Sequence, residues 1–108
     1  MKRWLFVPAL ALVFSAGTVY ADALALAKKS GCLACHSVEK KIVGPAWKDV
    51  SARYKGKDVK AALVAKIKKG GKGNWTEVTK GAPMPPYSPR VKDADIETLV
   101  DFVLSLAK

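Results

Sequence analysis

The stretch Cys32-Leu33-Ala34-Cys35-His36 decides how this chain folds, because it holds both cysteines and the single histidine of the sequence. Two thiols three positions apart lie on one face of a helical turn, so both can reach one edge of the same planar cofactor. The histidine that follows can then place its imidazole over a metal at the centre of that cofactor. This C-x-x-C-H spacing is the attachment signature of c-type haem.

Three other sites could use part of this motif. A thioredoxin-like dithiol shares C-x-x-C, but it needs a preceding strand and a βαβ setting, and the sequence shows neither. A structural zinc site needs four ligands, whereas Cys32, Cys35 and His36 supply three. A disulfide between the cysteines would close too small a loop to stabilise a domain. The motif therefore predicts one covalent haem c, bound through Cys32 and Cys35, with His36 as an axial iron ligand.

A second axial ligand must come from the residue types that bind haem iron, which include His, Met, Cys and Tyr. No other histidine or cysteine is present, and Met84 is the only methionine besides Met1. Met84 lies between Pro83 and Pro85-Pro86, and these prolines stiffen its backbone. We expect Met84 to ligate the iron. Packing is its alternative role, and Tyr54 and Tyr87 are the remaining candidate ligands.

The first 21 residues have the layout of a secretory signal peptide. Lys2 and Arg3 precede an uncharged, mostly apolar run over residues 4–16, and Val19-Tyr20-Ala21 offers a cleavage site. A retained membrane anchor is the alternative, but the run is shorter than the ~20 residues that a spanning helix needs. We predict cleavage after Ala21, which leaves residues 22–108 as one small domain without stable membrane insertion.

The domain is strongly basic, and its charge is uneven. Residues 22–108 keep 17 of the 19 Lys and Arg against 9 acids, a net charge of +8. Seven lysines fall between positions 55 and 72, whereas the segment from residue 93 is mostly acidic. Such an asymmetry can steer a protein towards an acidic partner, or it can simply keep the surface solvated. Nucleic acid is a poor candidate, because no nucleic-acid-binding motif accompanies the lysines.

Hydrophobic periodicity predicts an all-α domain of about four short helices. The expected helices cover residues 22–30, 46–54 and 59–69 and a C-terminal segment from residue 93. Asp58 and Asp93 are the expected N-caps of the last two. Residues 70–91 are rich in Gly and Pro and are expected to form an extended loop.

The chain resembles the class I cytochromes c, in particular the small bacterial cytochrome c-551/c-552 group. The resemblance covers essentially all of residues 22–108. Its anchors are the stretches 31–36, 43–50, 66–71 and 83–86, together with Trp75 and the amphipathic last helix. It implies the class I cytochrome c fold, in which the short helices wrap around one covalent haem.

The resemblance also implies roles for residues near the haem. The Pro45 carbonyl would accept a hydrogen bond from the second ring nitrogen of His36. Trp75 would point its indole N–H at a haem propionate, with Lys66 nearby, and core packing is the alternative for Trp75. Trp47 is expected to fill volume in the core.

Three further points follow from the resemblance. The first and last helices are expected to cross near Gly31, where the lack of a side chain allows close approach. Residues 76–82 make the loop before Met84 longer than in relatives. Tyr87 stands where many relatives place an Asn that can bond the methionine sulfur.

Filled axial positions favour one-electron transfer over the binding of substrate or oxygen. We therefore predict a soluble, monomeric, periplasmic electron carrier, not an enzyme, that serves larger redox proteins of a respiratory chain with acidic docking surfaces. Its exposed haem edge is expected near Leu33, Ala34 and residues 82–86. The alternatives are a gas-binding or catalytic haem protein with an open iron site, and a subunit permanently bound to a larger enzyme.

Overall fold

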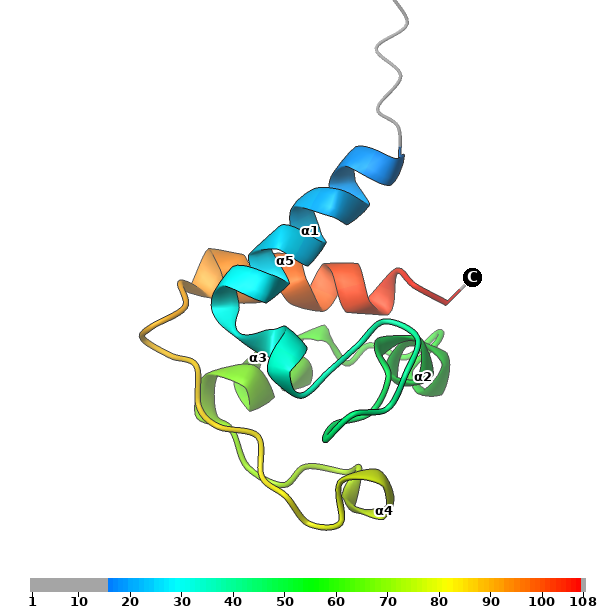
Figure 1. Ribbon diagram of the computed structural model, residues 1–108, viewed down its shortest axis with the longest axis vertical. Coiled ribbons are helices and arrows are strands. Elements are labelled where there is room, and N and C mark those ends of the chain that lie inside the picture. The colour runs from blue at the N-terminus through cyan, green and yellow to red at the C-terminus, as the bar shows by residue number, and fades with distance from the viewer. Residues whose placement is uncertain (1–15, 108) are drawn as a thin grey trace, which may run out of the picture.

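The computed structural model describes residues 16–107, and this part of the chain is helical. In order, its elements are α1 (Ala16–Ser30), η1 (Cys32–Ala34, a 3-10 helix), α2 (Trp47–Arg53), α3 (Lys60–Lys69), α4 (Thr76–Thr79) and α5 (Asp93–Leu104) (Figure 1). Between residues 16 and 107, β-pairing is limited to two isolated bridges. The predicted all-α class is therefore confirmed.

The structure describes only the last residues of the predicted signal peptide. Residues 1–15 of the predicted signal peptide lie outside the described residues. The first helix begins at Ala16, six residues earlier than expected, and runs through the predicted cleavage position. Within the described part of the chain, no helix combines the length and the apolar character needed to cross a membrane.

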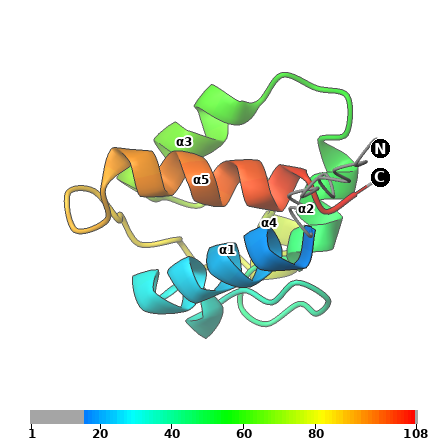
Figure 2. The same ribbon diagram turned by 90° about the horizontal axis from the view of Figure 1, so that it is seen from above.

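α1 and α5 pack across one another and form one of two core clusters (Figures 1 and 2). The buried alanines Ala23 and Ala27 of α1 meet Leu99 and Phe102 of α5. Residues four apart lie on the same face of a helix, so the two alanines form a narrow surface that allows close approach. Tyr20 of α1 adds its ring to Phe102, edge to face, with the ring centroids 5.2 Å apart.

The first and last helices cross as predicted, but the predicted close approach at Gly31 is wrong. A Cβ atom built at Gly31 would meet nothing within 4 Å, so the lack of a side chain there does not serve a close contact. Gly31 instead follows the end of α1 with a φ of +88°, a left-handed conformation that favours glycine after a helix. The alanines of α1, and not the glycine, make the close contact.

The second core cluster lies between α3, α5 and the loop that joins α4 to α5. Its buried members are Tyr87, Val91 and Ile96, and Val64, Ile67 and Met84 pack against them. α3 itself contains no buried residue. Its apolar side chains therefore rely on this cluster and on the cavity described below.

Both predicted N-caps are wrong. The N-cap of α3 is Val59, and no side chain, including that of Asp58, bonds to this helix end. α5 begins at Asp93 itself, after Lys92. Asp93 instead pairs with Lys68 of α3 at 3.1 Å, while its place in the first turn keeps its charge favourable for the helix dipole.

The expected loop over residues 70–91 contains a short helix. α4 occupies Thr76–Thr79, inside the longer segment 76–82. It lies at the end of the molecule furthest from α1 (Figure 1).

Ser51 ties α2 to the end of α5. Its side chain is 1% exposed, and its hydroxyl donates to the Leu104 carbonyl at 2.9 Å and accepts from the Ala107 N–H at 2.8 Å. The first bond satisfies a carbonyl that the end of α5 leaves without a partner, and the second holds the chain that follows the helix.

Candidate functional site

The helices and loops border a half-open cavity of about 380 Å³, within the range of ~300–1,000 Å³ that is usual for ligand pockets. Its walls come from residues 35–54, from α3 and α5 and from the segments around α4, and most of them are apolar. Six of the seven residues that the sequence assigned to the site line this cavity, namely Cys35, His36, Pro45, Lys66, Trp75 and Met84. The seventh, Cys32, is buried in the α1–α5 cluster beside it.

Three neighbours fix the His36 ring. Its Nδ1 donates to the Pro45 carbonyl at 2.9 Å. The Trp47 ring stacks on it with centroids 5.7 Å apart and an angle of 23°. The backbone of Gly44 borders the ring where no side chain would fit. With Nδ1 engaged by Pro45, the other ring nitrogen is left for a metal.

The electrostatics of His36 favour a neutral ring. Burial lowers its pKa, and the hydrogen bond to Pro45 opposes this only in part. A neutral imidazole is the form that ligates a metal. The surroundings of His36 therefore favour the protonation state in which an imidazole can bind a metal.

Backbone pairing holds the loop that carries Met84. The Met84 N–H donates to the Gly71 carbonyl at 2.9 Å, and the Gly71 N–H donates to the Met84 carbonyl at 2.8 Å. One step away, Gly70 has a φ of +72°, and a Cβ atom there would come within 2.8 Å of the Pro86 nitrogen. The C-terminal end of α3 also accepts a bond from the Tyr87 N–H at the Ile67 carbonyl, 3.1 Å long. These contacts place the thioether of Met84 on the wall of the cavity.

The two cysteines are free thiols at the turn after α1. Cys32 is buried and Cys35 is half-buried, and burial raises the pKa of Cys32. Arg90 lies close enough to act against this shift, and its guanidinium also donates to the Ser30 carbonyl at 3.3 Å. η1 thus places both thiols beside the wall that carries His36.

Both tyrosines that remained as candidate ligands also line the cavity. Tyr54 meets Trp75 edge to face, with ring centroids 6.4 Å apart. Tyr87 is buried in the second cluster beneath the guanidinium of Arg90, and burial raises the pKa of its phenol. Packing gives each ring a role without a metal.

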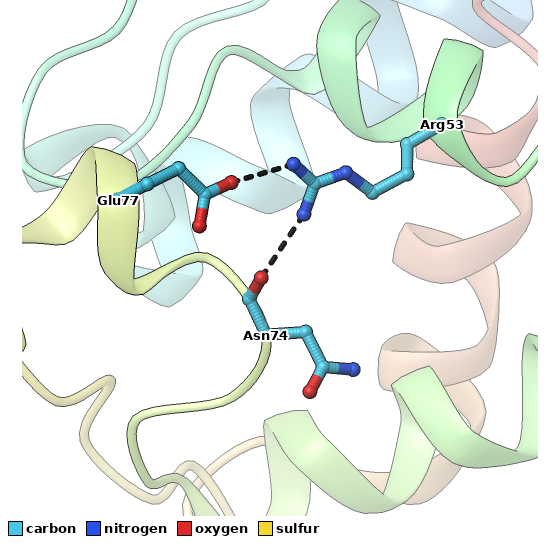
Figure 3. Close-up of polar contacts among 3 residues, drawn as sticks. All are labelled: Arg53, Asn74 and Glu77. Carbon is cyan, nitrogen blue, oxygen red and sulfur yellow. Dashed lines mark hydrogen bonds and ion pairs between the residues drawn. The ribbon is translucent and has the colours of Figure 1, made fainter.

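Trp75 has an unexpected neighbour in Arg53, the last residue of α2. The guanidinium carbon lies 3.4 Å from the centroid of the indole ring. Arg53 also donates to the carbonyl of Asn74 and to the carboxylate of Glu77 (Figure 3). Sequence reasoning missed Arg53, Asn74 and Glu77, because no local pattern relates α2 to a segment more than twenty residues later.

Part of the charge asymmetry is cancelled within the fold. Lys60 of α3 pairs with Asp101 of α5 at 3.0 Å, and Lys68 pairs with Asp93 at 3.1 Å. The basic segment and the acidic segment therefore lie side by side. Away from this contact, Ile42 and Val43 are 48% and 45% exposed, in the loop that follows His36.

The cavity fits a haem with one nitrogen and one sulfur ligand. A neutral imidazole and a thioether share an apolar space of suitable size, and a thioether and an imidazole are common axial ligands of haem iron. Among the described residues, no group of three His, Cys, Asp or Glu side chains could hold a separate metal ion.

Comparisons with known proteins agree with this geometry. The family described as Cytochrome c matches residues 20–107. The chain is 53% identical to cytochrome c-551 of Allochromatium vinosum, over 88% of this chain and 100% of that protein. It is 47% identical to cytochrome c-552 of Nitrosomonas europaea, over 95% of each.

Solved structures show the same likeness. The wild-type cytochrome c552 of Nitrosomonas europaea superposes with a TM-score of 0.68 at 48% identity, covering 77% of this chain and 98% of that chain. The class 1 cytochrome MtoD of Sideroxydans lithotrophicus ES-1 gives a TM-score of 0.64 at 28% identity, covering 80% and 94%. With its C-x-x-C-H motif, its apolar cavity and these relatives, the chain belongs to the cytochrome c family, as a small class I c-type cytochrome with one covalently attached haem c.

Proposed function

We propose that this cytochrome is a monomeric periplasmic electron carrier whose haem iron is ligated by His36 and Met84. The observation that carries the proposal is that the imidazole of His36 and the thioether of Met84 line one cavity. Cys32 and Cys35 hold the group covalently, and the predicted leader over residues 1–21 accounts for export to the periplasm.

A bound haem supplies a one-electron couple at its iron. His36 and Met84 would fill both axial positions, which leaves no open site for a substrate, so the proposal assigns the chain no catalysis of its own. A thioether ligand favours the reduced iron and raises the reduction potential relative to a second imidazole. Pro45 orients His36, and Trp75 and Lys66 are proposed to face the propionates.

The ligand assignment is tested by the near-infrared charge-transfer band of the oxidised protein, which marks sulfur bound to iron. We expect the band in the wild type and its loss in Met84→Ala, whose ferrous form should take up CO. Tyr54→Phe and Tyr87→Phe are matched controls that remove the other candidate ligands and should keep the band. A wild-type protein that lacks the band and takes up CO would overturn the proposal.

We further propose brief, electrostatic docking to acidic redox proteins of a respiratory chain. Val43 lines the cavity and is also exposed on the surface. The neighbouring residues Lys40, Lys41 and Ile42 are exposed as well. An apolar centre beside positive charges suits a patch that meets an acidic partner and separates again quickly.

The docking proposal is tested by association rates at increasing ionic strength. We expect the rate with an acidic redox partner to fall steeply as salt rises, and Lys41→Gln to lower the rate at low salt. Lys60→Gln is the matched control, because it removes an equal charge that is already paired with Asp101. Rates that do not change with salt would contradict electrostatic docking.

A further inference from the structure

One side chain, Arg53, makes three separate contacts with residues 74–77. Its Nη1 donates to the Asn74 carbonyl at 3.0 Å, and its Nη2 donates to Oε1 of Glu77 at 2.6 Å. Its guanidinium carbon lies 3.4 Å from the centroid of the Trp75 ring. Figure 3 shows the guanidinium reaching across from α2 to α4. A backbone group, a carboxylate and an aromatic ring are thus held by one planar cation.

Arg53 acts on Trp75 from outside the haem cavity. Asn74, Trp75 and Tyr54 all line the cavity, but Arg53 does not. Arg53 is exposed and Trp75 is half-buried, so the guanidinium meets the indole at the protein surface, while Tyr54 meets the same ring edge to face. The orientation of the Trp75 indole in the cavity wall therefore depends on the side chains that contact the ring, Arg53 and Tyr54.

Residues in the left-handed region of backbone conformation flank the segment that Arg53 holds. Gly71 and Gly73 precede it with φ values of +115° and +64°, and Lys80 and Gly81 follow it at +57° and +84°. Glycine leaves the backbone more conformational freedom than any other residue. Gly71 is held by its backbone pairing with Met84, so without a tether the segment could turn at Gly73 and at Gly81.

Few other tethers are available to this segment. Within residues 16–107, the Arg53 contacts are the only side-chain hydrogen bonds or ion pairs that join residues 74–79 to another helix. The other side-chain bond there is local, from the Gly81 N–H to the hydroxyl of Thr79. The tether is therefore concentrated in a single arginine.

The solvent exposure of the Arg53–Glu77 ion pair indicates that Arg53 serves to orient its neighbours more than to stabilise the fold. The Arg53 and Glu77 side chains are 37% and 56% exposed, and exposed ion pairs add little to stability. An arginine stacked on an aromatic ring nevertheless fixes orientation, because its planar fork is already shaped for both contacts and lysine cannot replace it.

We propose that Arg53 is a positioning residue that fixes the orientation of Trp75 and, through it, the reduction potential of the haem. The inference rests on the proposed contact between Trp75 and a haem propionate. A displaced indole would hold the propionate less well. The uncompensated negative charge would then favour the oxidised iron and lower the potential.

The test uses the haem-loaded protein and the variants Arg53→Gln, Arg53→Lys, Trp75→Phe and Lys60→Gln. The last is a matched control that removes one exposed positive charge from another ion pair. Voltammetry gives the potential, NMR of the ferrous protein gives the Trp75 indole N–H resonance, and thermal unfolding reports stability.

We expect both Arg53 variants to shift the indole resonance and lower the potential, while Lys60→Gln changes neither. The Lys variant keeps the charge, so its shift shows that the stacked geometry matters. Adding Arg53→Gln to Trp75→Phe should lower the potential no further, because residues that act through one contact are not additive.

An indole resonance that stays unchanged in Arg53→Gln would overturn the inference. So would a potential in Arg53→Gln that matches Lys60→Gln. If Trp75→Phe leaves the potential unchanged while Arg53→Gln still moves the indole resonance, the propionate role of Trp75 fails and the positioning of Trp75 by Arg53 stands. These results separate the two proposals.

Discussion

The imidazole of His36 lies so close to the backbone of Gly44 that a Cβ atom at Gly44 would stand 2.5 Å from Cε1 and 2.9 Å from Nδ1 of the ring. The Trp47 ring stacks on the same imidazole, with ring centroids 5.7 Å apart. The histidine is thus held by a buried indole and by a stretch of backbone without a side chain. The position of His36 depends on the absence of a side chain at Gly44 as much as on the indole of Trp47.

Gly44→Ala is therefore expected to displace His36, the first proposed iron ligand. Overpacking of this kind costs ~1–3 kcal/mol, and each kcal/mol lowers the midpoint of thermal unfolding by ~4–8 °C in a domain of this size. The visible spectrum should lose its low-spin character as well. Gly56→Ala is the control, because it strains a φ of +76° but meets nothing within 4 Å. An unchanged spectrum in Gly44→Ala would contradict the prediction.

Gly70→Ala should act on the other proposed ligand. A Cβ atom there would collide with the carbonyl of Met84 and come within 2.8 Å of the Pro86 nitrogen, and the φ of +72° disfavours alanine besides. We expect the near-infrared sulfur–iron band to weaken or disappear. Gly31→Ala has a similar φ and open space, so it separates backbone strain from the collision. Equal effects of the two variants would show that the collision has no part.

Ser51→Ala should reduce stability without altering the haem site. It leaves the Leu104 carbonyl and the Ala107 N–H without their partner, at a cost of ~1–3 kcal/mol for buried groups. Thermal unfolding measures this loss, and the visible spectrum should not change. Thr98→Ala is the control, since that exposed hydroxyl bonds only within its own helix and surface changes stay within ~0.5 kcal/mol. A spectral change in Ser51→Ala would point to a link with the haem that the contacts do not show.

The pKa of Glu77 should report on the contact with Arg53. The hydrogen bond from Arg53 is the main reason why the Glu77 pKa lies below its ordinary value. Because the folded pKa is the lower one, the unfolded chain binds more protons, and the contribution of Glu77 to stability is present above the unfolded pKa of ~4.3. It is lost as the pH falls through the folded value.

NMR titration of the Glu77 carboxyl measures this effect directly. Arg53→Gln should raise the pKa of Glu77 towards its ordinary value, and Lys60→Gln should leave the titration curve unchanged. The same curve in the wild type and in Arg53→Gln would show that the ion pair does not persist in solution.

A chain without haem should lose its cooperative fold. The cavity lies beside both core clusters, and α3 has no buried residue of its own. A domain of this size has little core to spare. The variant Cys32→Ala/Cys35→Ala, which cannot attach the group, should show a broad thermal transition and bind a dye for exposed apolar surface. A sharp transition at the wild-type temperature would contradict this expectation.

The sequence was informative where chemistry is concentrated in a few residues. A single histidine and a single internal methionine leave few candidate ligands, and both line the cavity. The helices with strong apolar periodicity were also found, although the start of α1 was misplaced. Such features depend on residue type and local spacing, which the sequence displays.

The features that were missed depend on contacts between distant segments. α4 has four residues and no apolar repeat, and its side-chain tether comes from Arg53 in α2. Asp93 pairs with Lys68 across two helices instead of capping its own. The close helix crossing uses Ala23 and Ala27, which carry no signal stronger than that of the other alanines of α1. Tertiary contacts of this kind leave no local pattern.

The edge-to-face contact between Tyr20 and Phe102 has a consequence for maturation. Tyr20 lies within the predicted leader, so removal of residues 1–21 would take away one of the two aromatic rings that contact Phe102 and leave Trp47 as the other. The precursor would then cover an edge of Phe102 that the processed protein presents to water at the crossing of its first and last helices. The leader would then do more than direct export. It would also cover part of the α1–α5 contact until it is cleaved.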